Sequence, residues 1–139
     1  MKSTRSQRGF TLIELMVVIV IIAILAMIAM NAYGNYITRS KVQAAKADLT
    51  ALSLNLENEL QRSLVYGTYQ LNSVGEIKDK YKGWSPSQVN SFTYSLNSEP
   101  TKYTITAKGI SGSLSTCVLT FDSTATGGVA GSCGSITTW

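Results

Sequence analysis

Glu14 is the residue in this sequence best suited to specific chemistry, because it places a carboxylate inside an otherwise apolar run from Phe10 to Met30. An ionised side chain at the centre of a membrane helix costs at least about 2.5 to 3.5 kcal/mol, and less near an end. A carboxylate at such a position is therefore expected to pair with a buried cation. A charge that snorkels from the interface into water is the simpler alternative.

Other reactive side chains are sparse. The chain has no histidine, which removes the commonest general base and metal ligand at neutral pH. No nucleophile stands out with a base and an orienting residue, and no glycine-rich loop of the kind that cradles phosphates is present. The sequence therefore predicts a structural protein, without enzymatic activity, metal or cofactor.

Two cysteines, Cys117 and Cys133, lie in the polar C-terminal part. A cytosolic domain with two free thiols would have the same sequence, so the compartment decides between thiols and a disulfide. If this part of the chain is exported, we expect the disulfide. Closing a loop of this size stabilises a fold by roughly 3 kcal/mol in the chain-entropy model.

The apolar run that holds Glu14 is long enough to cross a membrane, since a helix rises about 1.5 Å per residue and the hydrocarbon layer is roughly 30 Å thick. Lys2, Arg5 and Arg8 precede it, and the positive-inside rule keeps them cytoplasmic. They also supply most of the net charge of +4, which is therefore no argument for nucleic-acid binding. An ordinary secretory signal is the alternative, but its apolar region would be shorter and end in an A-x-A site.

Helical periodicity continues beyond the apolar run. Apolar residues recur at three- and four-residue spacing and predict one helix from about residue 10 to about residue 65, with Gly67 as the stop signal: Val42, Ala45, Leu49, Leu52, Leu56 and Leu60. Its charged residues are expected on a solvated outer face: Arg39, Lys41, Lys46, Asp48, Glu57, Glu59 and Arg62.

The C-terminal half changes to a period of two, which is typical of strands with one buried face. Residues 67–91 form a connection that has room for a helical turn or a small strand. Three alternating segments, around Tyr94, Tyr103 and Leu119, then predict antiparallel strands. Residues 123–132 are expected to be a loop, and 133–139 a tail or a fourth strand. The fold class is α+β, with a long N-terminal helix packed on an antiparallel sheet of three to four strands.

The junction at Gly9 and Phe10, followed by Glu14, resembles the processing site of type IV prepilins, called a class III signal sequence. The resemblance implies that a prepilin peptidase cuts between Gly9 and Phe10 and methylates the new amino group of Phe10. In filaments of this family the carboxylate pairs with the N-terminal amine of a neighbouring subunit. The implied parts are a leader (1–9), a transmembrane and filament-core helix (10–33) and a periplasmic pilin domain (34–139).

A broader pattern is similar to PilE-like minor pilins and includes Tyr33, Tyr36, the Tyr94 and Tyr103 strands and the late cysteine pair. It implies a minor pilin that helps to initiate or assemble a type IV pilus. Its partners would be other pilin subunits, the prepilin peptidase and the inner-membrane assembly machinery. The subunit would start in the inner membrane and end in an extracellular pilus. A major pilin, a type II secretion pseudopilin and a DNA-binding competence pilin remain alternatives.

The sequence departs from the family at two positions of the membrane helix. Ala23 stands where glycine is common, and Asn31 stands where proline is common. Proline lacks a backbone donor and clashes within a helix. We therefore expect a straighter membrane helix than is usual in the family.

Lys78, Lys80, Lys82 and Trp84 combine basic and aromatic groups, as surfaces that bind single-stranded nucleic acid do. Glu76 and Asp79 are interleaved with them, and a mixed run of this kind is usually a solvated loop. DNA contact at these residues is therefore the weaker hypothesis.

Overall fold

The computed structural model describes residues 9–139, so the predicted leader charges Lys2, Arg5 and Arg8 lie outside the described residues. The chain divides into two compact units, one up to Gly34 and one from Asn35 to Trp139. Helix α1 (Leu12–Ser63) contributes to both units. The functional boundaries at residues 9 and 33 stay predictions.

In the unit up to Gly34, the first half of α1 has apolar side chains that no other described part of the chain covers. Val18 is the least exposed of the large apolar side chains between Phe10 and Met30, and it is still 49% exposed. By length and composition this part of α1 is able to cross a membrane. A continuous apolar surface of this kind requires lipid or other protein as its surroundings.

Residues 23–30 are helical within α1. Ala23 thus occupies an ordinary helical position, as its high helix propensity favours. The expectation of an unusually straight helix in the assembled state stays a prediction.

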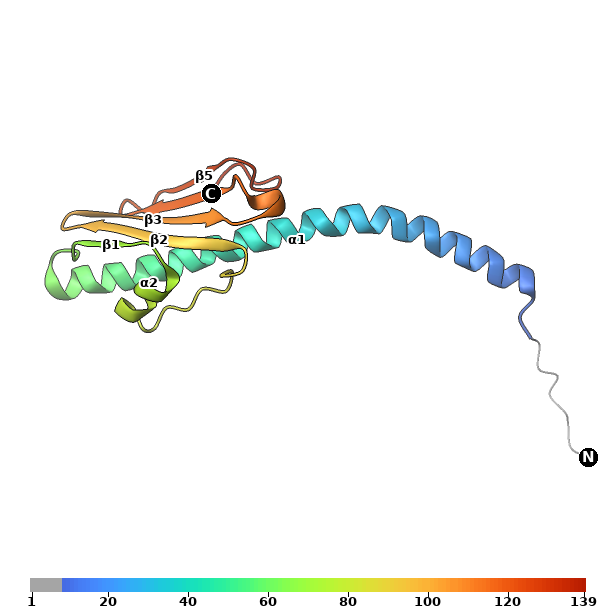
Figure 1. Cartoon of the computed structure of the whole chain (residues 1–139), viewed down its shortest axis with the longest axis horizontal. Coiled ribbons are helices and arrows are strands. Elements are labelled where there is room, and N and C mark those ends of the chain that lie inside the picture. The colour runs from blue at the N-terminus through green and yellow to red at the C-terminus, as the bar shows by residue number, and fades with distance from the viewer. Residues whose placement is uncertain (1–8) are drawn as a thin grey trace, which may run out of the picture. The chain divides into compact units, whose positions relative to one another are not determined.

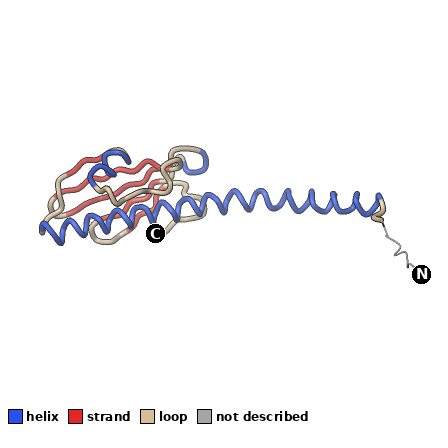
Figure 2. Tube along the Cα trace, turned by 90° about the horizontal axis from the view of Figure 1, so that it is seen from below, coloured by secondary structure: helices blue, strands red, loops and turns tan. Residues whose placement is uncertain are grey.

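In the unit from Asn35 onward, the second half of α1 packs against one face of a sheet (Figures 1 and 2). The predicted apolar stripe is confirmed, because five of its members are fully buried in the core: Val42, Ala45, Leu49, Leu52 and Leu56. Burying a Leu or Val side chain contributes about 1.5 to 3 kcal/mol. This stripe is therefore a main source of the stability of the unit.

The sheet has five antiparallel strands in sequential order. They are β1 (Tyr69–Leu71), β2 (Phe92–Glu99), β3 (Lys102–Gly109), β4 (Val118–Asp122) and β5 (Gly127–Ala130). A short helix, α2 (Val74–Lys80), lies between β1 and β2, and a 3-10 turn (Gly112–Leu114) lies between β3 and β4. The α+β class and the three central strands are confirmed, and the predicted connection at 67–91 contains both a strand and a helix.

The expected strand count was too low, and the expected loop at 123–132 was wrong where β5 forms. Gly127 and Gly128 begin β5 without any apolar alternation, so the period-two test misses the strand. Gly127 lies under the indole of Trp139, because an added Cβ would fall 1.8 Å from that ring. The C-terminal segment 133–139 forms no strand and packs as a tail.

The expected helix stop at Gly67 was also wrong. Helix α1 ends at Ser63, and Leu64 adopts the left-handed conformation with φ of 64°. The Leu64 N–H donates to the Leu60 carbonyl at 2.7 Å, which closes the last turn. A non-glycine residue in this conformation is uncommon, so a search for glycine places the end too late.

The expected solvated face of α1 was wrong for five of its charged residues, because Lys46 and Asp48 are buried and Lys41, Glu57 and Glu59 are partly buried. Asp48 accepts hydrogen bonds from the Tyr94 hydroxyl at 2.6 Å, from Ser87 N–H at 3.0 Å and from Gln88 N–H at 3.2 Å. Helical spacing cannot reveal these partners, since they come from distant parts of the chain.

Glu57 and Glu59 bind tyrosine hydroxyls. Glu57 Oε1 accepts from Tyr66 at 2.9 Å and from Tyr103 at 3.0 Å. Glu59 accepts from Tyr69 at 2.8 Å and from Tyr81 at 2.5 Å. Each carboxylate thus joins α1 to a strand or loop through hydrogen bonds to an ionised acceptor, which are stronger than neutral ones.

Lys46 attaches the tail to α1. Its ammonium donates to the Thr138 carbonyl at 2.8 Å and lies 5.4 Å from the ring centre of Trp139. That ring packs at 5.2 Å from Phe121 on β4. The tail therefore covers a buried cation and extends the core.

The predicted disulfide between Cys117 and Cys133 is confirmed, and both residues are fully buried. It joins the residue before β4 to the residues after β5. The bond thereby closes a loop that contains β4 and the edge strand β5.

We expect the Cys117→Ser/Cys133→Ser variant to lose roughly 3 kcal/mol of unfolding free energy, because its unfolded chain gains the entropy of the open loop. Urea unfolding of the full chain in detergent micelles measures this loss. Reductant should destabilise the wild type by a similar amount and leave the variant unchanged. Equal urea midpoints for the oxidised and reduced wild type would contradict the prediction.

Burial raises the pKa of Tyr66 to about 12, and the neighbouring Glu57 carboxylate adds to the shift. Tyrosine in an unfolded chain ionises near pH 10. The neutral hydroxyl therefore stabilises the fold fully below about pH 10, and this contribution disappears as pH rises towards 12. We expect Tyr66→Phe to be less stable than wild type at pH 8 but to lose less stability between pH 10 and 12.

The control for this prediction is Tyr36→Phe, which alters an exposed tyrosine. Its unfolding free energy should follow that of the wild type across the same pH range. Parallel curves for Tyr66→Phe and wild type above pH 10 would show that Tyr66 does not carry the effect.

Candidate functional site

Glu14 lies in the first turn of α1, where it forms a capping box with Thr11. Its Oε2 accepts from Thr11 N–H at 2.9 Å and from the Thr11 hydroxyl at 2.9 Å, while Glu14 N–H donates back to Thr11 Oγ1 at 3.3 Å. Thr11 is the N-cap and Glu14 the third helical residue, the spacing that such reciprocal caps require. The carboxylate is therefore held in a defined position at the start of the helix.

The surroundings of Glu14 are apolar and open. Phe10, Ile13, Val17 and Val18 line a shallow hollow of about 310 Å³ beside it. Among residues 9–139, no hydrogen bond reaches Glu14 Oε1 and no cation pairs with the carboxylate. The capping box satisfies part of the acceptor capacity of the carboxylate and leaves its charge unpaired.

Gly9 precedes this site and lies outside any helix or strand. A Cβ added at Gly9 would meet no atom within 4 Å, and the backbone there does not adopt a positive φ. The fold thus gives no steric reason for a glycine at this position. This leaves recognition by another molecule as a reason for its presence.

The residues proposed for DNA contact are only partly available. Lys78, Lys80 and Lys82 are exposed, but Trp84 is 2% exposed. Its indole N–H donates to the Asp48 carbonyl at 2.8 Å, and its ring packs edge-on against Tyr94 at 5.5 Å. Trp84 belongs to the core, so its inclusion as a stacking platform for bases was wrong.

Sequence reasoning missed the capping role of Thr11. The signal was present, because a threonine followed three residues later by a glutamate, directly before an apolar run, is the capping-box pattern.

Within residues 9–139 there is no group of three or more His, Cys, Asp or Glu side chains that could hold a metal ion.

Comparison with known proteins adds one finding about this end of the chain. A family model described as the prokaryotic N-terminal methylation motif matches residues 4–30. This motif is the class III signal sequence of type IV prepilins. The match ends where the apolar run ends and does not extend into the globular unit. No solved structure matches the chain.

Proposed function

We propose that this chain is a prepilin-type subunit of a type IV pilus, and more specifically a minor pilin that helps to initiate or assemble the fibre. The observation that carries the proposal is the capped Glu14, a charged carboxylate that has no cation partner among residues 9–139 and lies on an exposed apolar helix. Such a charge is tolerated in an apolar assembly only when a partner neutralises it. In this proposal a second subunit supplies the cation that pairs with Glu14.

Processing would supply the cation. A prepilin peptidase would cut between Gly9 and Phe10 and methylate the new amino group of Phe10, which places a positive charge close to the start of α1. Glu14 of one subunit would then pair with the Phe10 amine of its neighbour. Thr11 supports this arrangement because its two hydrogen bonds to Oε2 fix the carboxylate and leave Oε1 available.

The apolar half of α1, the basic leader and the disulfide also support a proposed location. Before assembly, the apolar half of α1 would lie in the inner membrane with the basic leader in the cytoplasm. The globular unit would face the periplasm, where the disulfide between Cys117 and Cys133 fits the oxidising conditions. Assembly would transfer the helix from lipid into the apolar core of the fibre.

A major pilin and a secretion pseudopilin would share Gly9, Phe10 and Glu14, so the cleavage site does not separate them from a minor pilin. The broader PilE-like pattern favours the minor pilin, and the disulfide argues against a secretion pseudopilin. Its amount relative to the other subunits in sheared fibres distinguishes these roles, because a minor subunit is present in traces and a major one dominates.

We expect Glu14→Gln to fold and insert normally but to enter fibres poorly. Glutamine still completes a capping box with Thr11, so the variant removes the charge and keeps the cap. The measurement is the ratio of processed subunit in sheared fibres to that in the membrane fraction. We expect a reduction of about tenfold, equivalent to about 1.4 kcal/mol of lost pairing.

Thr11→Val is the matched control, since it weakens the cap by about 1 kcal/mol and keeps the carboxylate. It should enter fibres better than Glu14→Gln does. Wild-type amounts of the Glu14→Gln protein in fibres would refute the charge-pair role.

Replacement of Gly9 by leucine is expected to block processing, and the chain would then retain residues 1–9. The fold offers space for a side chain at this position, so misfolding does not explain such a block. Mass spectrometry of the membrane fraction distinguishes the uncut chain from one that begins at Phe10. A Gly9→Leu chain processed as efficiently as wild type would contradict the assigned cleavage site.

A further inference from the structure

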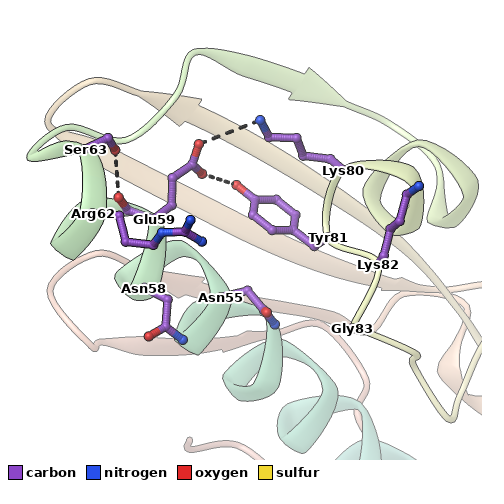
Figure 3. Close-up of a pocket in the computed structure, with 9 residues that line it drawn as sticks. All are labelled: Asn55, Asn58, Glu59, Arg62, Ser63, Lys80, Tyr81, Lys82 and Gly83. Atoms are coloured by element: carbon purple, nitrogen blue, oxygen red, sulfur yellow. Dashed lines mark hydrogen bonds and ion pairs between the residues drawn. The ribbon is translucent and has the colours of Figure 1, made fainter.

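A groove of about 600 Å³ lies on the globular unit, between the last turns of α1 and the residues that follow α2. Figure 3 shows its two walls. Helix α1 contributes one wall and residues 80–83 contribute the other. The side chains that matter here are Asn55, Asn58, Glu59, Arg62, Lys80 and Lys82.

The one carboxylate in the groove, Glu59, is already engaged within the fold. Its Oε2 accepts from the Tyr81 hydroxyl, and its Oε1 lies 3.8 Å from the Lys80 ammonium (Figure 3). The same Oε1 also accepts from the Tyr69 hydroxyl. Lys80 also lies 4.3 Å from the ring centre of Tyr69. Glu59 and Lys80 therefore satisfy each other, together with the two tyrosines.

Arg62 and Lys82 remain as exposed cations, and neither forms an ion pair with any other residue in the described part of the chain. The groove thus has an excess of positive charge. The C-terminal end of α1 opposes it with the equivalent of about half a negative charge, which is too small to cancel two cations. The amides of Asn55 and Asn58 line the same wall as Arg62 and provide further hydrogen-bonding groups.

We propose that this groove binds the carboxylates of an acidic segment on a neighbouring subunit, with Arg62 and Lys82 as the contacting cations. The inference rests on the proposed function, since it needs an assembled fibre. The planar guanidinium of Arg62 fits a carboxylate through two parallel hydrogen bonds, and the Lys82 ammonium adds a second point of attachment. The contact is one between globular units, separate from the helix start at Glu14.

A protein carboxylate suits the groove better than a nucleic-acid strand. Single-strand binding depends on exposed aromatic faces, whereas Tyr81 and Trp84 are both buried. Glu76 and Asp79, exposed on the adjacent α2, would repel a phosphate backbone that extended beyond the groove. The positive charge is thus confined to a space that suits one or two acidic side chains.

Carbodiimide cross-linking of fibres tests the proposal, because the reagent joins a lysine amine to a carboxylate in direct contact. In fibres that contain the full processed chain, we expect Lys82 to be linked to an Asp or Glu of a neighbouring subunit, as identified by mass spectrometry. Arg62→Gln should lower the yield of this link by at least about fivefold, since the carboxylate loses its second cation. Fibres that contain the subunit but no intermolecular link at Lys82 would overturn the proposal.

Lys108→Gln is the matched control, because it removes one exposed charge from β3, outside the groove. It should leave the Lys82 link unchanged, and an equal loss in both variants would also overturn the proposal. Absence of the wild-type chain from fibres would instead refute the proposed function, and this inference with it.

A labelled single-stranded oligonucleotide tests the nucleic-acid alternative on the full chain in detergent micelles. We expect no retention that depends on the groove cations. Retention by wild type that is lost in Arg62→Gln/Lys82→Gln would assign the groove to nucleic acid and overturn the subunit contact.

Discussion

The globular unit depends on carboxylates of α1 that bind groups from distant parts of the chain. Asp48 is the most connected, since it holds Tyr94 on β2 and the backbone of Ser87 and Gln88. Glu57 and Glu59, further along α1, bind tyrosines from β1, β3 and the connecting segments. An ionised acceptor that is only partly solvated is costly without donors, so these contacts select one arrangement of loops around the helix. The groove beside Arg62 exists because Glu59 holds Tyr81 at its base.

The two halves of helix α1 differ in composition and burial, and their charged residues reflect this difference. In the globular unit the carboxylates are satisfied by tyrosine hydroxyls within the same chain. In the apolar half the single carboxylate, Glu14, is held by Thr11 but pairs with no cation among residues 9–139. The first group of contacts completes the fold of one subunit. The second leaves one interaction incomplete, and in the proposed fibre a neighbouring subunit completes it.

The features that sequence predicted are those determined by local pattern. The apolar run, the stripe from Val42 to Leu56 and the alternation around Tyr94 and Tyr103 depend on residues close in sequence. The disulfide followed from the expected compartment. The family resemblance rested on Gly9, Phe10 and Glu14, and the comparison places its motif over the same residues.

The features that sequence missed depend on contacts across the fold. Strand β5 pairs with β4 although Gly127 and Gly128 carry no pattern, and Gly127 makes room for Trp139. The burial of Trp84 depends on the Asp48 carbonyl, which is 36 residues away in the sequence. Arg62 became a candidate only when the fold placed it opposite Lys82. None of these contacts and placements follows a periodic pattern in the sequence.

The sheet itself is poorly suited to grow into a larger sheet. Its outer strands, β1 and β5, have only three and four residues, so each edge presents few unpaired backbone groups. Short edges of this kind protect against edge-to-edge pairing and amyloid-like stacking. A chain that polymerised through its helix, as proposed, would therefore reach a high local concentration in a membrane without its sheets joining. Growth of such a fibre would leave every strand pairing within the subunit intact.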